Sequence, residues 1–179
     1  MMFVRCLLFL VLLVSCSESE FREGDVLFQS MHTRQAPLHS YVSGLSKTHC
    51  GIVVRKDDGL YVLEPLEQVT LTPIDNFIRR GLMHKYWVKH SPVSDFKVLY
   101  KNYLGLPTDS VFQFDNGSYY CAELVYEIYL KQLGLKLCEP KRLKEYGPVR
   151  YTPVDSIPGI DMEQFIVTPD DIFNSPVFR

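Results

Sequence analysis

The sequence YCAELVYEIYLKQLG, residues 120–134, contains the clearest helical pattern of the chain. Counted from Cys121, apolar side chains recur at i, i+3, i+4 and i+7, which places them on one face of a helix. Gly134 can end this helix in the left-handed conformation that other residues avoid. We therefore predict a helix over residues 120–133 that buries one face and begins at a cysteine.

The position of Cys121 makes it a candidate nucleophile. A cysteine at the start of a helix lies next to backbone N–H groups and to the positive end of the helix dipole, and both favour a thiolate. The alternative interpretation is a small apolar residue on the buried face of the helix, which is a common place for cysteine. Because the helix alone fits both interpretations, the choice depends on residues that precede it in the chain.

Two β-rich runs, residues 49–55 and 61–64, are separated by the sequence KDDG, whose Asp-Gly pair is a strong hairpin signal. Antiparallel pairing across this turn can bring His49 and Glu64 together on one face of the sheet. A nucleophilic thiolate needs a base such as histidine and a third polar group that orients the imidazole. The alternatives are a hydrogen-bonded strand histidine and an exposed strand-end carboxylate. Gly51 leaves room beside His49, and Glu64 ends an apolar run in which a lone charge must find a partner, so we favour the catalytic interpretation.

The remaining pattern predicts a mixture of strands and helices. We expect further strands at residues 26–28, 85–89 and 165–167, and further helices from Pro73 to Gly81 and over residues 94–104. Asn116 and Ser118 are available as caps for the helix that begins near Cys121. With mostly antiparallel pairing, these elements define an α+β fold.

Composition limits the class of protein. The chain has 179 residues, of which 46% are hydrophobic and 22% charged, as expected of one ordinary globular domain. Its 21 acidic and 19 basic side chains give a formal net charge of −2, which is too balanced for a surface that must neutralise several phosphates. We therefore expect no nucleic-acid partner, and the sequence does not indicate an oligomeric state.

The first sixteen residues, MMFVRCLLFLVLLVSC, predict a signal peptide. Arg5 precedes an apolar run over residues 7–14, which is shorter than the roughly 20 residues that a membrane-spanning helix needs. The sequence LVSC resembles the lipobox of bacterial lipoproteins, in which the cysteine, here Cys16, is lipidated and becomes the mature N-terminus. The alternative is an ordinary secretory signal followed by a chance cysteine. Because Ser17 is not the aspartate of an inner-membrane retention signal, we expect a lipid-anchored protein of the bacterial envelope, at the outer membrane.

The chain is thus predicted to have three parts. Residues 1–15 form the signal peptide, residues 16–20 contain the lipidated Cys16 and a short tether, and residues 21–179 form one domain. With Cys16 lipidated, an odd number of thiols remains in the domain, so at least one stays unpaired. Whether Cys50 and Cys138 pair is left open.

The main alternative is that His49, Glu64 and the cysteines bind a zinc ion. Spacings typical of metal sites, C-x-x-C or H-x-x-x-H, are absent from the sequence. In a strand, His49 and Cys50 point to opposite faces, so they cannot easily share one metal ion. We therefore predict no metal site and no cofactor, and we expect Cys50 to pack in the core.

These segments together resemble a known family. The order GDVLFQ (residues 24–29), THCGIVV (48–54), YVLEP (61–65) and YCAELVYEIY (120–129) is similar to that of the circularly permuted papain-like members of the NlpC/P60 superfamily, the YiiX/YebB-like branch. The resemblance implies a permuted papain-like α+β fold in which an antiparallel sheet packs against the helix that carries the cysteine. It also implies that Cys121 is the nucleophile, His49 the general base and Glu64 the residue that orients the histidine. Tyr120, directly before Cys121, matches a tyrosine of the motif and is expected to line the substrate pocket.

The same resemblance implies cleavage of an amide bond, in a cell-wall peptide or in an N-acyl or lipid-like amide, by hydrolysis or acyl transfer. Two alternatives stay open: a lipid-ester hydrolase that uses the same three residues, and a lipid- or peptide-binding module in which they are idle. We expect the loops at residues 31–47 and 107–119 to form an aromatic, mostly apolar groove for the substrate. The aromatic side chains of these loops are Tyr41, Phe112, Phe114 and Tyr119. The alternative is that they only pack the loops onto the domain.

Overall fold

The computed structural model describes residues 20–31, 47–146 and 159–178. The strands are β1 (Val26–Gln29), β2 (His49–Lys56), β3 (Gly59–Pro65), β4 (Val69–Pro73), β5 (Tyr86–Lys89), β6 (Lys141–Arg142) and β7 (Phe165–Ile166). The α-helices are α2 (Ile74–Arg80), α3 (Cys121–Leu133) and α4 (Pro169–Phe173), and 3-10 turns lie at Leu82–His84, Tyr100–Asn102 and Leu143–Tyr146. This combination is the α+β class that the sequence predicts. The predicted signal peptide and its Cys16 lie outside the described residues.

Five strands form one antiparallel sheet in the order β4-β3-β2-β1-β5. The predicted hairpin is present: β2 and β3 pair up to Lys56 and Gly59, on either side of the Asp-Asp turn. β2 is the central strand, and residues 49–54 of it are buried. Strands β6 and β7 form a separate two-stranded sheet.

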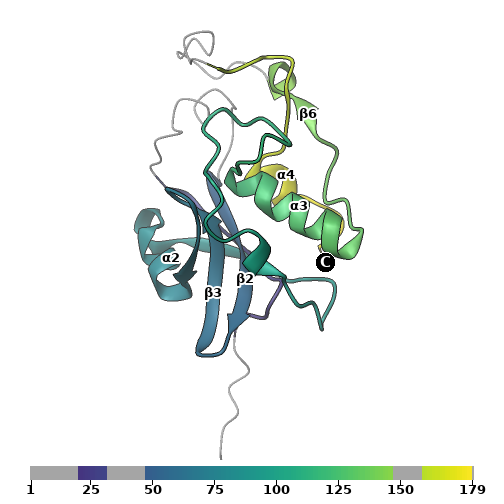
Figure 1. The fold of residues 1–179 in the computed structure, drawn as a ribbon. Helices are drawn as coiled ribbons and strands as arrows, with labels where there is room; N and C mark the ends of the chain where they lie inside the picture. Colours follow the sequence, from purple (N-terminus) through teal and green to yellow (C-terminus); the bar gives the residue numbers. More distant parts are fainter. Residues whose placement is uncertain (1–19, 32–46, 147–158, 179) are drawn as a thin grey trace, which may run out of the picture.

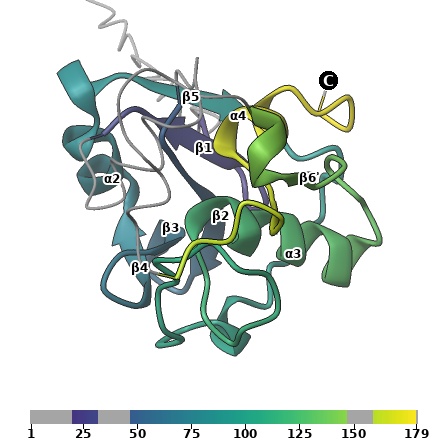
Figure 2. The same ribbon diagram turned by 90° about the horizontal axis from the view of Figure 1, so that it is seen from above.

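Helices cover both faces of the five-stranded sheet (Figures 1 and 2). α3 and α4 pack on one face, and α2 packs on the other. Ile52 and Val54 of β2 belong to the larger core under α3, whereas Val53 belongs to the smaller core under α2. Neighbouring residues of a strand point to opposite faces, so odd and even positions of β2 contact different helices. Among the described residues, no helix has the length and apolar character needed to cross a membrane.

Helix α3 confirms the helix predicted from the apolar spacing. Gly134 ends it in the left-handed conformation, with a φ of 67°. The first half of α3 is buried all round, including the two carboxylate side chains Glu123 and Glu127. The loop before the helix covers the side of α3 that carries Glu127, where the hydroxyl of Tyr119 donates to Oε1 of Glu127 at 2.7 Å. The start of α3 is therefore held between the sheet and this loop.

The predicted capping of α3 by Asn116 or Ser118 is wrong. Tyr120 holds the N-cap position, and its side chain makes no capping hydrogen bond. The side-chain oxygen of Asn116 instead accepts hydrogen bonds from the backbone N–H and the hydroxyl of Ser118, at 2.9 and 2.6 Å. Both polar residues thus stabilise the turn before the helix and not the helix itself.

The helix predicted at residues 94–104 is also wrong, because the structure has only the 3-10 turn Tyr100–Asn102 in this segment. Phe96 and Val98 are both buried, and two buried side chains two positions apart are typical of extended chain. The backbone N–H of Val98 donates to the carboxylate of Glu23 at 3.0 Å. This tertiary bond takes the place of a helical one, so the apolar spacing alone was misleading.

The other predicted elements are confirmed by β1, β5, β7 and α2, whereas β4 and α4 were not predicted. Helix α4 begins with a capping box. The hydroxyl of Thr168 accepts from the N–H of Asp171 at 3.1 Å, and the carboxylate of Asp171 accepts from the N–H of Thr168 at 2.9 Å. The sequence TPDD carries this signal, so the helix could have been found from the residues.

Candidate active site

The sheet brings His49 and Glu64 together at one end of the β2–β3 hairpin. Nε2 of His49 lies 2.6 Å from Oε2 of Glu64. Only 5% of His49 and none of Glu64 is exposed. Ile52 pairs with Leu63, which places Glu64 opposite Gly51. His49 lies two residues before Gly51, so His49 and Glu64 are diagonal neighbours on one face of the sheet. The contact that the hairpin predicted is therefore present.

Gly51 allows the two strands to meet this closely. A Cβ atom at Gly51 would lie 2.4 Å from Cγ1 of Val62 and 3.3 Å from Cβ of Glu64. With a larger residue in place of Gly51, β3 would have to move away from β2 near the carboxylate of Glu64. The small residue beside His49 thus has the role expected from the sequence.

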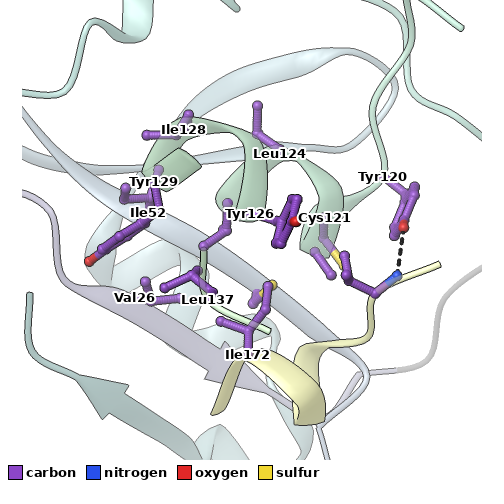
Figure 3. Packing of buried hydrophobic residues seen from close by; sticks show 14 of the residues in the cluster. Val26, Ile52, Tyr120, Cys121, Leu124, Tyr126, Ile128, Tyr129, Leu137 and Ile172 are labelled. Carbon is purple, nitrogen blue, oxygen red and sulfur yellow. Dashed lines mark hydrogen bonds between the residues drawn. The ribbon is translucent and has the colours of Figure 1, made fainter. Parts of the chain in front are cut away.

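Cys121 reaches the same place from the start of α3. Its side chain is 3% exposed and packs in the core between the helix and the sheet. Figure 3 shows Cys121 and Tyr120 where the chain enters the helix. A side-chain hydrogen bond joins Cys121 to His49. His49 therefore lies between the thiol of Cys121 and the carboxylate of Glu64.

The surroundings of His49 favour its protonated form. Burial acts to lower the pKa of His49, but the charge of Cys121 and hydrogen bonds with Cys121 and Glu64 outweigh it and raise the pKa from 6.5 to about 9. His49 consequently carries its second proton at neutral pH. An imidazolium next to a cysteine at a helix N-terminus favours the thiolate. Such a pair can attack a carbonyl carbon and then give a proton to the leaving group.

Glu64 has two further partners that the sequence analysis missed. Arg80, the last residue of α2, forms an ion pair with Oε1 of Glu64, and Thr72 of β4 forms a side-chain hydrogen bond with the carboxylate. Burial acts to raise the pKa of Glu64, but His49 and then Arg80 and Thr72 outweigh it and hold the pKa below its usual value. Glu64 is therefore a carboxylate at neutral pH. No spacing rule in the sequence distinguishes Arg80 from Arg79, so only the structure could identify this partner.

Cys50 packs in the core on the α3 side of the sheet, as predicted. Its thiol also forms a hydrogen bond with Cys121, which the sequence did not suggest. Burial, followed by the neighbouring Cys121 and Glu64, raises the pKa of Cys50 well above its usual value, so this thiol stays protonated. Cys50 and Cys138 do not form a disulfide in the structure.

The two described tyrosines among the predicted substrate-binding residues, Tyr119 and Tyr120, have hydrogen-bond partners within the protein. Tyr120, expected to line the pocket, is 1% exposed, and its hydroxyl accepts a hydrogen bond from the backbone N–H of Val167 at 3.0 Å (Figure 3). The N-cap residue thus turns into the core, where its hydroxyl satisfies the backbone N–H of Val167, and its place in a substrate pocket stays a prediction. Tyr119 points along α3 towards its bond with Glu127. Tyr41 lies outside the described residues.

The described aromatic side chains of residues 107–119 pack the loop onto the domain, which was the alternative to an aromatic groove. The rings of Phe112 and Phe114 lie 4.9 and 6.2 Å from the ring of Tyr120, measured between centroids. Phe114 does line a cavity of about 430 Å³ on the outer side of α3. Neither Cys121 nor His49 is among the residues that line this cavity. The cavity is therefore separate from the thiol.

This arrangement defines a papain-like cysteine hydrolase in permuted form, since the strand that carries His49 precedes the helix that begins at Cys121. The model of the YaeF/YiiX family of permuted papain-like amidases, peptidase family C92, matches residues 20–178. The chain belongs to this family and is a cysteine amidase or peptidase-type hydrolase.

Two relatives show how far the similarity extends. The uncharacterized protein YiiX of Escherichia coli strain K12 is 29% identical over 184 residues, which cover 95% of this chain and 91% of YiiX. The crystal structure of the metalloprotein YiiX from Escherichia coli O157:H7 matches this fold with a TM-score of 0.77 at 26% identity. That match covers 88% of this chain and 94% of that chain.

Because that relative is described as a metalloprotein, the arrangement of the donor groups in this chain matters. Among the described residues, no three His, Cys, Asp or Glu side chains are grouped so that they could hold one. His49 and Glu64 bond to each other, and Cys50 lies on the other face of β2. These residues do not fit a metal site.

The first prediction concerns the pH dependence of Cys121. Since the pKa of His49 is raised to about 9, the imidazolium is present below that pH and is lost above it. We expect iodoacetamide to alkylate Cys121 nearly as fast at about pH 7 as at about pH 8.5, whereas an ordinary thiol slows roughly tenfold over that range. Mass spectrometry of the Cys121 peptide measures the rate. In His49→Ala the ordinary pH dependence should return; identical profiles for the two proteins would contradict the ion pair.

The second prediction concerns Gly51. In Gly51→Ala the new Cβ would lie 2.9 Å from the carbonyl oxygen of Leu63 and even closer to Val62, so β3 must shift. We expect the free energy of unfolding to fall by about 1–3 kcal/mol and the alkylation rate of Cys121 to fall with it. Urea denaturation measures the first effect. Arg55→Ala, at an exposed position of the same strand, is the matched control, and equal stability of the two variants would refute the packing argument.

Proposed function

We propose that this protein cleaves an amide bond of an envelope substrate, either a cell-wall peptide or an N-acyl or lipid-like amide, with Cys121 as the nucleophile. The observation that carries the proposal is the hydrogen-bonded row from Cys121 through His49 to Glu64 at the start of α3. Glu64 orients the imidazole ring and stabilises its positive charge, as the third member of such a row does. Membership of an amidase family supports the same reaction class.

The first half of the proposed reaction forms a thioester. Sγ of Cys121 bonds to the amide carbonyl carbon, and the carbonyl oxygen becomes an oxyanion. The backbone N–H of Cys121, in the first turn of α3, is one donor to that oxygen. When the C–N bond breaks, His49 gives its proton to the leaving amine.

The second half restores the enzyme. His49 takes a proton from water, the water oxygen attacks the thioester carbon, and the C–S bond breaks to release a carboxylic acid. The proton on His49 then faces the thiolate of Cys121 again, as at the start. In acyl transfer, an amine or hydroxyl acceptor takes the place of water.

For the location, we propose that lipid on Cys16 anchors the protein to the bacterial envelope, at the outer membrane. The support is the sequence of residues 1–16, with one arginine, a short apolar run and a lipobox-like end. The substrate would then be met close to the membrane surface, on the periplasmic or the outer side.

The third prediction tests the nucleophile. A thiol-directed activity probe should label the wild type and lose nearly all labelling in Cys121→Ala. Cys138→Ala is the matched control, because it removes a free thiol whose pKa burial raises to about 12, so that Cys138 is a poor nucleophile. Equal labelling of wild type and Cys121→Ala would remove Cys121 from its role.

Turnover by the full chain then distinguishes the substrates. We would incubate wild type and Cys121→Ala with muropeptides, N-acyl amino acids and phospholipids, and follow products by mass spectrometry. Product from either amide class that disappears in Cys121→Ala supports the proposal. Product from phospholipids alone would identify a lipid-ester hydrolase, and tight binding without product would identify a binding module.

The fourth prediction tests the anchor. Replacing Cys16 by Ser removes the only thiol that lipid could occupy at the predicted cleavage site. We expect Cys16→Ser to be released from membranes or to remain unprocessed, as judged by membrane fractionation and the mass of the mature chain. Unchanged membrane association of a processed Cys16→Ser would contradict the lipid anchor.

A further inference from the structure

We infer that Arg80 is a positioning residue of the proposed reaction: its guanidinium holds Glu64 in the orientation in which the carboxylate bonds His49. This inference rests on the proposed function, because it assigns Arg80 a part in the row that ends at Cys121. In this role Arg80 acts through Glu64 and not on the thiol itself.

The first argument is the division of the Glu64 oxygens between two partners. Oε2 lies 2.6 Å from Nε2 of His49, and Oε1 is paired with Nη2 of Arg80. The carboxylate is fully buried, so it can stay charged only if both oxygens are compensated. With Oε1 fixed by the guanidinium, rotation that would turn Oε2 away from His49 is opposed.

The second argument is that the position of Arg80 is itself fixed. Arg80 ends α2, and Ile74 and Phe77 of that helix are buried in the smaller core. The guanidinium carbon lies 5.8 Å from the centroid of the Phe77 ring, and the same ring stacks on His49 at 5.9 Å. Arg80, Phe77 and His49 therefore form one packed row beside Glu64.

The third argument comes from an unsatisfied atom. Nε of Arg80 is buried and has no hydrogen-bond partner in the part of the chain that the structure describes. A buried N–H without a partner is unfavourable, so some stronger interaction must keep the side chain there. The charge-assisted bond to Glu64 is that interaction.

The groups around Glu64 predict how its pKa responds to the loss of Arg80. The groups that act on the carboxylate are His49 of β2, Arg80 of α2 and Thr72 of β4, and Cys50 feels its charge from the other face. Arg80 favours the charged form of Glu64, so its loss should raise the pKa of Glu64. A protonated Glu64 cannot stabilise the imidazolium of His49.

The experiment compares Arg80→Met with Arg79→Met, a matched loss of one positive charge at the preceding residue. Arg79 bonds Asn76 on the surface and is not a partner of Glu64. We expect Arg80→Met to slow labelling of Cys121 by the activity probe about tenfold or more, and to move the acidic limb of the rate to higher pH by about one unit. Arg79→Met should leave both rate and pH profile unchanged.

Chemical rescue separates a positioning role from a merely structural one. Thr72, Arg79 and Arg80 line a cavity of about 500 Å³, and Arg80 also pairs with Glu64, so Arg80→Ala would leave a space between this cavity and the carboxylate that a small cation can fill. Added methylguanidinium should restore much of the labelling rate of Arg80→Ala and have no effect on wild type. Arg80→Lys, which keeps the charge but not the planar fork, should fall between wild type and Arg80→Met.

The outcomes distinguish this inference from the proposed function. If Cys121→Ala abolishes labelling but Arg80→Met behaves like Arg79→Met, the reaction stands and the role of Arg80 is wrong. If Cys121→Ala is labelled like wild type, the proposed function itself fails. Should Arg80→Met or Arg80→Ala not fold, shown by circular dichroism, the pH profile of Arg80→Lys decides: an acidic limb identical to that of wild type overturns the inference.

Discussion

The buried hydrogen bond between His49 and Glu64 is the interaction on which the rest of the site depends. A carboxylate with no exposed surface is costly unless its charge is compensated. The sheet and α2 provide that compensation from three elements, through His49 of β2, Thr72 of β4 and Arg80 of α2. The histidine can be oriented only when β2, β3 and β4 have formed their ladder and α2 has packed against it. The reactive geometry is thus a property of the whole sheet and not of one motif.

The thiol of Cys121 contacts side chains from both faces of the central strand β2. His49 and Cys50 are consecutive residues that point to opposite faces, yet each forms a hydrogen bond with Cys121. Since Cys50 stays protonated, its S–H can act as a weak donor to the sulfur of Cys121, alongside the imidazolium. The thiolate is therefore stabilised from both sides, and a shift of α3 relative to β2 would weaken both contacts at once.

Local signals explain which parts of this structure the sequence predicted. The Asp-Gly pair that predicted the hairpin, the helical apolar spacing after Cys121 and the glycine at residue 134 each act within a few residues, and all three indicated the right element. The same spacing rule failed at residues 94–104, because there a tertiary bond from Glu23 fixes an extended backbone. The buried hydrogen bond between Tyr120 and the backbone N–H of Val167 is likewise a tertiary contact that no local signal gives. Arg80 depends on where α2 ends relative to β3, which no local pattern encodes.

Helix α2 contributes to the chemistry although it packs on the face of the sheet opposite α3. Its Phe77 ring stacks on His49 and lies close to the guanidinium of Arg80, so one aromatic ring is near two cations. The negative face of an aromatic ring attracts cations. Two cations that share one buried carboxylate would otherwise repel each other, and the ring lowers that cost. The smaller core under the sheet therefore does more than stabilise the fold. Through Phe77 it holds the two cations that keep Glu64 charged.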